Sequence, residues 1–170
     1  SAQLYPDRIA ICHGQTRFTY RQFYQRACCL SGALQTRFSI KAGDTVSVLL
    51  ANTPPMLECH YGIPMTGAVI HSINTRLDAA AIAFQLEHAL SKLLFVDSEF
   101  SKLASAALSL LDNPPAVVIY RDPEIQRDAE SECEYEALLG LGRPDTPWYS
   151  PESEWDAISL NYSSGTTGNP

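Results

Sequence analysis

The chain has 170 residues, of which 45% are hydrophobic and 18% are charged, a balance typical of a globular domain with its own core. Its net charge of −7, from 19 acidic and 12 basic residues, argues against nucleic-acid binding by bulk electrostatics. No apolar run reaches the roughly 18 residues that a membrane span needs, so none is predicted. The five cysteines include no C-x-x-C pair and favour a reducing, intracellular compartment.

The first forty residues predict a hairpin followed by a helix. Residues 9–13 alternate toward Gly14, and residues 16–18 form the returning strand. Thr19 and Gln22 have the spacing of a capping box, and apolar residues continue at helical spacing as far as Leu34.

Apolar runs then alternate with helical patterns. Helices are expected after Asn52, where Pro54 suits a first turn, after a cap at Asp78, and over residues 99–111. The strands between them are expected at residues 46–50, 68–73, 93–97 and 116–120. Near-continuous apolar strands separated by helices indicate βαβ units. The sequence therefore predicts an α/β fold, with a mostly parallel sheet covered by helices on both faces.

Residues 121–154 interrupt this pattern with an acidic, proline-containing connector. Between Arg121 and Glu136 seven acidic residues stand against two arginines, and one helical turn is expected at residues 135–139. Because the acids are spread out, they favour a solvated surface loop over a metal site.

The final predicted strand, residues 157–162, leads into a loop rich in hydroxyl groups and glycine. Its candidate ligand-binding residues are Ser163, Ser164, Gly165, Thr166, Thr167 and Gly168. Glycine allows the backbone to approach an anion closely, while the hydroxyls and backbone N–H groups donate hydrogen bonds. The loop therefore suits a phosphate cradle, although an exposed Ser/Thr/Gly linker has the same composition.

The order of these residues resembles a known phosphate loop. A P-loop would require a Gly-Lys pair, which is absent. Residues 162–170 are instead similar to the aromatic-[ST]-S-G-T-T-G-x-P-K loop of the adenylate-forming, or AMP-binding, superfamily. Residues 5–10, 74–77, 87–89 and 92–97 likewise resemble the N-terminal region of plant-type acyl-activating enzymes.

The resemblance implies that residues 1–170 are a partial N-terminal AMP-binding domain, with its connector at 121–154 and its phosphate loop at 162–170. It implies an ATP-dependent acid–CoA ligase that forms an acyl-adenylate from a small carboxylic acid, in the cytoplasm or in peroxisomes. ATP, Mg²⁺ and coenzyme A would be its cofactors, and Thr166 or Thr167 is a candidate Mg²⁺ ligand. The family's lysine and ribose-binding aspartate would follow Pro170. We therefore expect no catalytic residue in this chain, a need for the missing C-terminal portion, and no turnover by the chain alone.

Two other interpretations stay open. The chain is also compatible with a truncated, non-catalytic interaction domain that keeps the fold. A serine nucleophile at Ser163 or Ser164 would need a base, and no motif links the four histidines to these serines. His60 and His71 are expected to be structural histidines with satisfied hydrogen bonds.

Overall fold

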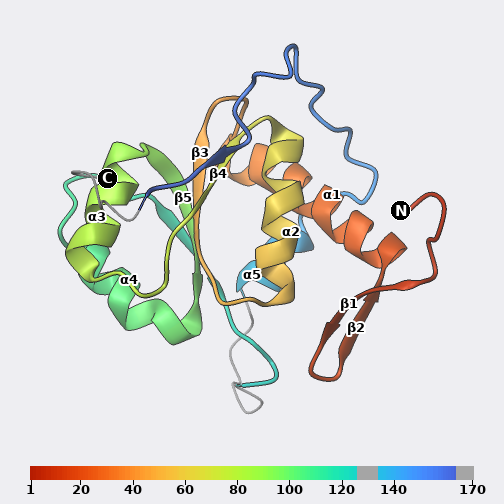
Figure 1. Cartoon of the computed structure of the whole chain (residues 1–170), viewed down its shortest axis with the longest axis horizontal. Helices are drawn as coiled ribbons and strands as arrows, with labels where there is room; N and C mark the ends of the chain where they lie inside the picture. The colour runs from red at the N-terminus through yellow and green to blue at the C-terminus, as the bar shows by residue number, and fades with distance from the viewer. Residues whose placement is uncertain (126–133, 164–170) are drawn as a thin grey trace.

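A five-stranded parallel sheet organises the part of the chain that the computed structural model describes, residues 1–125 and 134–163. Its order is β6-β5-β3-β4-β7, and each pair of neighbouring strands is parallel. The strands are β3 (Thr45–Leu49), β4 (Val69–Ser72), β5 (Ser91–Asp97), β6 (Ala116–Tyr120) and β7 (Ser159–Leu160). A separate antiparallel hairpin, β1 (Ile9–His13) and β2 (Thr16–Thr19), lies apart from this sheet beside helix α1 (Figure 1).

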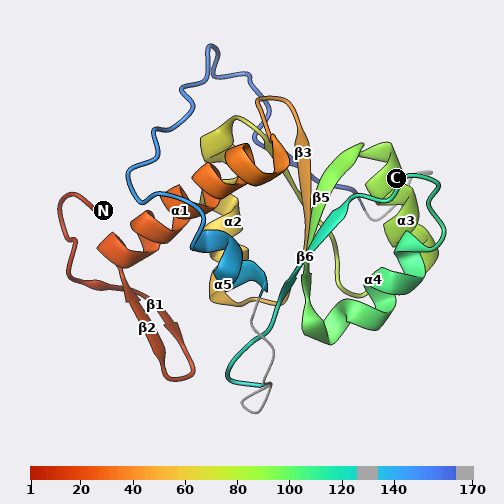
Figure 2. The same cartoon turned by 180° about the vertical axis from the view of Figure 1, so that it is seen from behind.

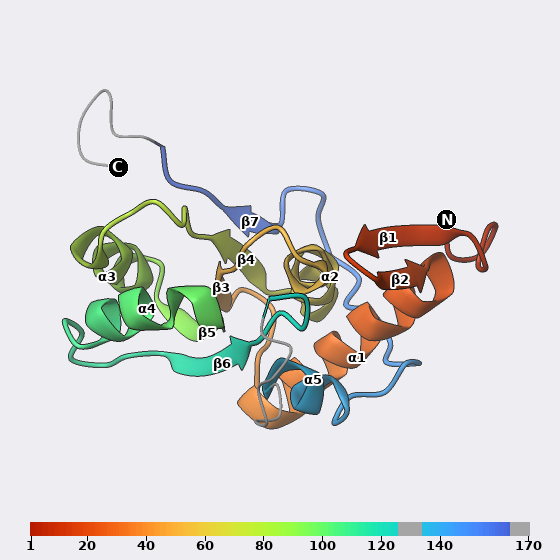
Figure 3. The ribbon, with the colours of Figure 1, turned by 90° about the horizontal axis from the view of Figure 1, so that it is seen from below.

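Helices cover both faces of the sheet, as the alternating pattern predicts. One face carries α1 (Tyr20–Phe38), α2 (Pro54–Gly62) and α5 (Glu134–Leu139), and the other carries α3 (Ala79–His88) and α4 (Ser101–Leu108) (Figures 2 and 3). Each face has its own apolar core, because successive strand residues point to opposite sides. Val46 and Val48 belong to the first core, and Leu49 belongs to the second. The α/β prediction is confirmed.

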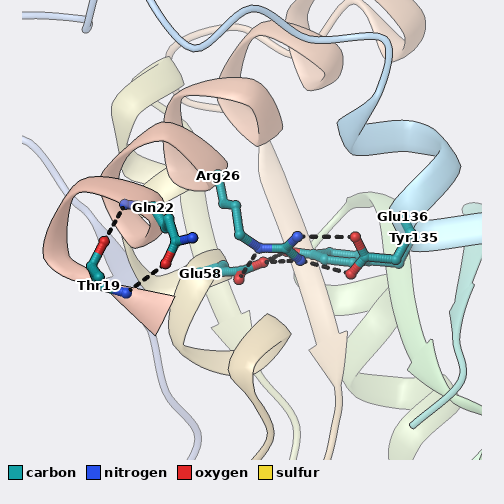
Figure 4. Close-up of polar contacts among 6 residues, drawn as sticks. All are labelled: Thr19, Gln22, Arg26, Glu58, Tyr135 and Glu136. Carbon is teal, nitrogen blue, oxygen red and sulfur yellow. Dashed lines mark hydrogen bonds and ion pairs between the residues drawn. The ribbon is translucent and has the colours of Figure 1, made fainter. Parts of the chain in front are cut away.

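The residues at the two ends of the long helix α1 explain where it begins and ends. The Thr19 side chain accepts a hydrogen bond from the Gln22 backbone N–H, and the Gln22 side chain accepts one from the Thr19 backbone N–H (Figure 4). This reciprocal pairing satisfies two N–H groups at the helix start and confirms the capping box. The helix ends at Ser39, whose φ of 54° lies in the left-handed region that often terminates helices.

A buried ion pair joins the three helices of the first face. The carboxylate of Glu58 is fully buried; it accepts hydrogen bonds from Arg26 Nε at 2.6 Å and from the Tyr135 hydroxyl at 2.7 Å (Figure 4). The Arg26 guanidinium also donates to Glu136, at 2.6 Å and 3.0 Å, and lies over the ring of Phe18. Buried carboxylates are rare unless paired in this way, so the network fixes how α1, α2 and α5 pack.

The acidic connector is not simply a solvated loop. Asp122 is buried and pairs with His13 at 2.8 Å; Glu134 accepts a hydrogen bond from the Ile119 backbone N–H at 3.0 Å. Glu136 completes the Arg26 network, while Tyr135 contributes its ring to the core. The prediction of a solvated acidic segment was wrong for Asp122, whose partner His13 lies 109 residues away, whereas Glu134 and Glu136 are exposed as expected although both have partners.

Two further elements differ from their predicted lengths. The helix expected over residues 99–111 is divided into η2 (Ser98–Phe100) and α4, because Asp97 caps Glu99 and the backbone turns at Phe100. The last strand has two residues rather than six. Among the described residues it pairs only with β4, and Trp155 and Ile158 before it are 96% and 62% exposed, so it is a short edge strand rather than a buried one.

Candidate functional site

The short strand β7 delivers the start of the candidate loop to the carboxyl edge of the sheet. Ser159 and Leu160 pair with Ile70 and His71 of β4, after which the chain leaves the ladder. Ser163 follows as an exposed residue outside the strand. Ligands of open α/β sheets bind at the carboxyl ends of the strands, so the direction of β7 places Ser163 at the expected edge.

Tyr162, the aromatic residue before Ser163, contacts two histidines from different elements. Its hydroxyl hydrogen-bonds to His88 Nδ1 of α3 at 2.7 Å. Its ring centroid lies 5.1 Å from that of His71 and 5.7 Å from that of His88. His88 in turn stacks on Phe84, with centroids 5.6 Å apart. The residue that precedes the candidate loop is therefore held between β4 and α3.

His71 is fully buried beneath this contact, and its Nδ1 lies 2.8 Å from the Ser47 hydroxyl of β3. Ser47 also hydrogen-bonds to Ser91 at the start of β5, so polar side chains cross three neighbouring strands. The Nε2 atom of His71 is buried and makes no hydrogen bond of ordinary geometry in the described part of the chain, although the Gln85 side chain lies close enough to the ring to raise its pKa against the effect of burial. Burial lowers the pKa of His71 below its ordinary value of 6.5, so the ring is neutral at physiological pH.

Two buried carboxylates lie beyond other strands at the same edge. Asp97 at the end of β5 accepts a hydrogen bond from the Glu99 backbone N–H at 3.1 Å. Burial raises its pKa, with the nearby charges of Glu99 and Asp122 adding to the effect. Asp122 is paired with His13. These acids are withdrawn from solvent and have partners, so they do not form an exposed cation site. Within residues 1–125 and 134–163, no three His, Cys, Asp or Glu side chains gather to hold a metal.

Comparison with known proteins decides the family. The family model described as "AMP-binding enzyme" matches residues 1–170. The chain belongs to the AMP-binding enzyme family. The peroxisomal benzoate–CoA ligase of Arabidopsis thaliana is 42% identical over 181 residues, and the peroxisomal acetate/butyrate–CoA ligase AAE7 of the same plant is 39% identical over 183. These matches cover all of this chain but only 31% and 32% of the relatives, so the chain spans about a third of their length.

Solved structures of similar proteins agree on the fold of this AMP-binding chain. The anthranilate CoA ligase AuaEII, in complex with anthranoyl-AMP, superposes with a TM-score of 0.86 at 24% identity, over 98% of this chain and 31% of that protein. The inhibitor-bound N-terminal domain of FACL13 from Mycobacterium tuberculosis gives a TM-score of 0.82 at 26% identity, over 99% of this chain and 40% of that protein. The resemblance to plant acyl-activating enzymes is confirmed by the family model and by the Arabidopsis relatives.

Only the start of the predicted loop falls within the described residues of this AMP-binding chain. Ser163 is exposed and outside the ladder; Ser164, Gly165, Thr166, Thr167 and Gly168 lie outside the described residues. Their roles in phosphate and Mg²⁺ binding therefore stay predictions. No described helix combines the length and hydropathy needed to cross a bilayer.

The histidines beside Tyr162 were missed as site residues. His71 was expected to be a satisfied structural histidine, which holds for Nδ1 but not for Nε2. His88 belongs to a segment that resembles the family, but its contact could not be predicted, because its partner Tyr162 lies 74 residues away in the sequence. The one available hint was a strand histidine in an otherwise apolar run, and that pattern alone does not reveal what the ring contacts.

Proposed function

We propose that this chain is the ATP-phosphate-binding part of an acid–CoA ligase that activates a carboxylic acid as its adenylate. Membership of the AMP-binding family carries the proposal. Full-length relatives named as CoA ligases support it, as does the placement of exposed Ser163 at the carboxyl edge of a parallel sheet.

The reaction explains why the loop needs donors. The substrate carboxylate attacks the α-phosphate of ATP, which gives an acyl-adenylate and releases pyrophosphate; the thiol of coenzyme A then displaces AMP. Negative charge grows on the departing pyrophosphate, so donors aimed at the β- and γ-phosphates stabilise the transition state selectively.

The residues of this chain fit that role. Ser163 offers its hydroxyl from an exposed position. Ser164, Thr166 and Thr167 would add donors, and either threonine would hold Mg²⁺, which neutralises phosphate charge when bound. Gly165 and Gly168 would allow the backbone to follow the phosphates closely.

The substrate class follows from the relatives alone. Those named above act, by name, on benzoate and on acetate or butyrate, so we infer a short aliphatic or aromatic carboxylic acid. Several relatives are named as peroxisomal, which supports an intracellular location in peroxisomes or cytoplasm.

Phosphate binding is the first test. We expect the chain to bind Mg·ATP and tripolyphosphate, but to bind AMP more weakly, because AMP lacks the β- and γ-phosphates. The change Ser163→Ala should weaken ATP binding about tenfold by removing one hydrogen bond to a charged group. Isothermal titration measures both affinities. Ser105→Ala, an exposed serine on α4, is the matched control. Equal affinities for AMP and tripolyphosphate would contradict the assignment.

Catalysis is the second test. Because the chain spans about a third of the length of its ligase relatives, we expect it to bind ATP without activating an acid. ATP–pyrophosphate exchange with benzoate, acetate and butyrate should stay at background. Exchange above background with any of these acids would show that the 170 residues suffice.

A further inference from the structure

Strand β7 by itself provides little support for the direction in which the chain enters the candidate loop. It has two residues and, in the part of the chain that the structure describes, one neighbouring strand; the segment before it is exposed at Trp155 and Ile158. Hydrogen-bond donors that bind a phosphate must be placed accurately, because a displacement of about 1 Å can lower a reaction rate about 100-fold. The residue at which the loop begins therefore needs a fixed position.

Tyr162 supplies such a starting point, because it is restrained from two directions. The ring of His71 on β4 lies against its ring at 5.1 Å, and His88 on α3 holds its hydroxyl at 2.7 Å. Two contacts on different ends of a rigid ring restrain both its position and its tilt. Ser163 is the next residue, so its backbone direction follows from that of Tyr162.

The support beneath Tyr162 is itself rigid. His71 is fully buried in the middle of β4, and Ser47 holds its Nδ1 at 2.8 Å. Ser47 is joined to Ser91, so three central strands contribute to the orientation of the imidazole. Burying Nε2 without a hydrogen bond of ordinary geometry among the described residues is costly, although the Gln85 side chain beside the ring partly offsets the effect of burial. An apolar side chain would fill the same space without that cost.

We propose that His71 and His88 are positioning residues that clamp Tyr162 and thereby set the direction of Ser163 for phosphate binding. This inference rests on the proposed function for its ligand, but the clamp itself is a property of the fold. The geometry favours positioning over acid–base chemistry: the His71 ring is closed off from solvent, with its Nδ1 held by Ser47, and His88 Nδ1 is engaged by the Tyr162 hydroxyl.

Variants at the exposed end of the clamp test the proposal without threatening the fold. Tyr162→Phe and His88→Ala each remove the same hydrogen bond, while Tyr162 is only half-buried and His88 is exposed. His88→Asn keeps a side-chain amide near the position of Nδ1 and should restore the contact. Val118→Ala, a buried change in β6 at the opposite edge of the sheet, controls for a general loss of stability.

Two readouts are needed, both on the whole chain. Backbone amide shifts of Ser163 and Gly165 in ¹H–¹⁵N spectra report loop direction without any ligand, and isothermal titration with tripolyphosphate reports binding. We expect Tyr162→Phe and His88→Ala to move both amides and to weaken tripolyphosphate about tenfold. The double variant should be no worse than His88→Ala alone, because the hydrogen bond that Tyr162→Phe removes is already lost when His88 is replaced. His88→Asn and Val118→Ala should resemble the wild type.

The outcomes separate the two proposals. If the wild type binds tripolyphosphate and both clamp variants bind it equally well with unchanged Ser163 and Gly165 amides, positioning is overturned and the proposed function stands. If the amides move in the clamp variants but the wild type binds no tripolyphosphate, the clamp stands and the proposed function fails. If Val118→Ala moves the same amides and weakens binding as much, the effect is one of general stability and positioning is overturned.

Discussion

Two buried polar networks lie on opposite faces of the main sheet, and they differ in charge and in where they lead. On the face covered by α1, α2 and α5, Arg26 is held by Glu58 and Glu136, with Tyr135 adding a hydrogen bond. On the face covered by α3 and α4, Ser47 and His71 form a neutral pair beneath Tyr162. The first network is closed among helices, whereas the second continues to the candidate site.

In the charged network, the hydrogen bonds between Arg26 and its two carboxylate partners offset the cost of burying the guanidinium. Burial alone would lower the pKa of the Arg26 guanidinium, but its hydrogen bonds to Glu136 and Glu58 outweigh burial and raise it above its ordinary value. The neutral network needs no such compensation, because burial lowers the pKa of His71 and keeps the ring uncharged. On one face, the charged groups of Arg26, Glu58 and Glu136 hold the helices together. On the other face, the neutral imidazole of His71 packs against Tyr162.

Removing the buried carboxylate should have the largest effect. Glu58→Ala leaves Arg26 without its buried partner, and such losses cost about 3–5 kcal/mol. We expect about 3 kcal/mol in the free energy of unfolding, since Arg26 keeps Glu136 and is 21% exposed. Urea unfolding followed by circular dichroism measures it. Glu87→Ala, an exposed change on α3, should alter stability by less than about 0.5 kcal/mol. A similar small effect of Glu58→Ala would show that the ion pair is dispensable.

Much of this contrast could not be predicted from the sequence. Local signals were sufficient for strands β3 to β6, for the capping box at Thr19 and for the cap at Asp78, since these depend on residues within a few positions of one another. Glu58 and Tyr135 are 77 residues apart, and only the folded chain brings them together. The same is true of Tyr162 and His88.

Only the contiguous part of the candidate site could be predicted from the sequence. The motif beginning at Ser163 is contiguous, so its family resemblance is visible in the sequence, whereas the residues that orient Tyr162 come from other elements. The predicted length of β7 was wrong because an apolar run does not reveal how many neighbouring strands are available to pair with it.

Lowering the pH should distinguish the neutral network from the charged one. The unfolded chain protonates His71 below about pH 6.5, but the folded chain resists protonation because its pKa is lowered by burial. Stability from this group is therefore present above pH 6.5 and is lost as the pH falls toward the folded pKa, by at most about 1.4 kcal/mol per pH unit.

The measurement is the free energy of unfolding at pH 7.5 and 5.5. His71→Asn should reduce the loss of stability between these two values, since the variant has no imidazole to protonate. Val118→Ala, which removes buried volume elsewhere, should keep the wild-type loss. If the wild type and His71→Asn lose the same stability, the pH response does not come from His71.

The exposed end of the charged network should matter least. Glu136 is 47% exposed, and its bond to Arg26 is screened by solvent, so Glu136→Gln should cost less than about 1 kcal/mol. Because Arg26 keeps its buried partner Glu58, no uncompensated buried charge is created. Urea unfolding in 0.05 M and 0.5 M NaCl should show the difference from wild type shrinking at high salt, as screening predicts. A loss as large as that of Glu58→Ala, and insensitive to salt, would mean that Glu136 and Glu58 act as one unit. The stabilisation would then come from binding of the Arg26 guanidinium by both carboxylates together, rather than from the buried Glu58 alone.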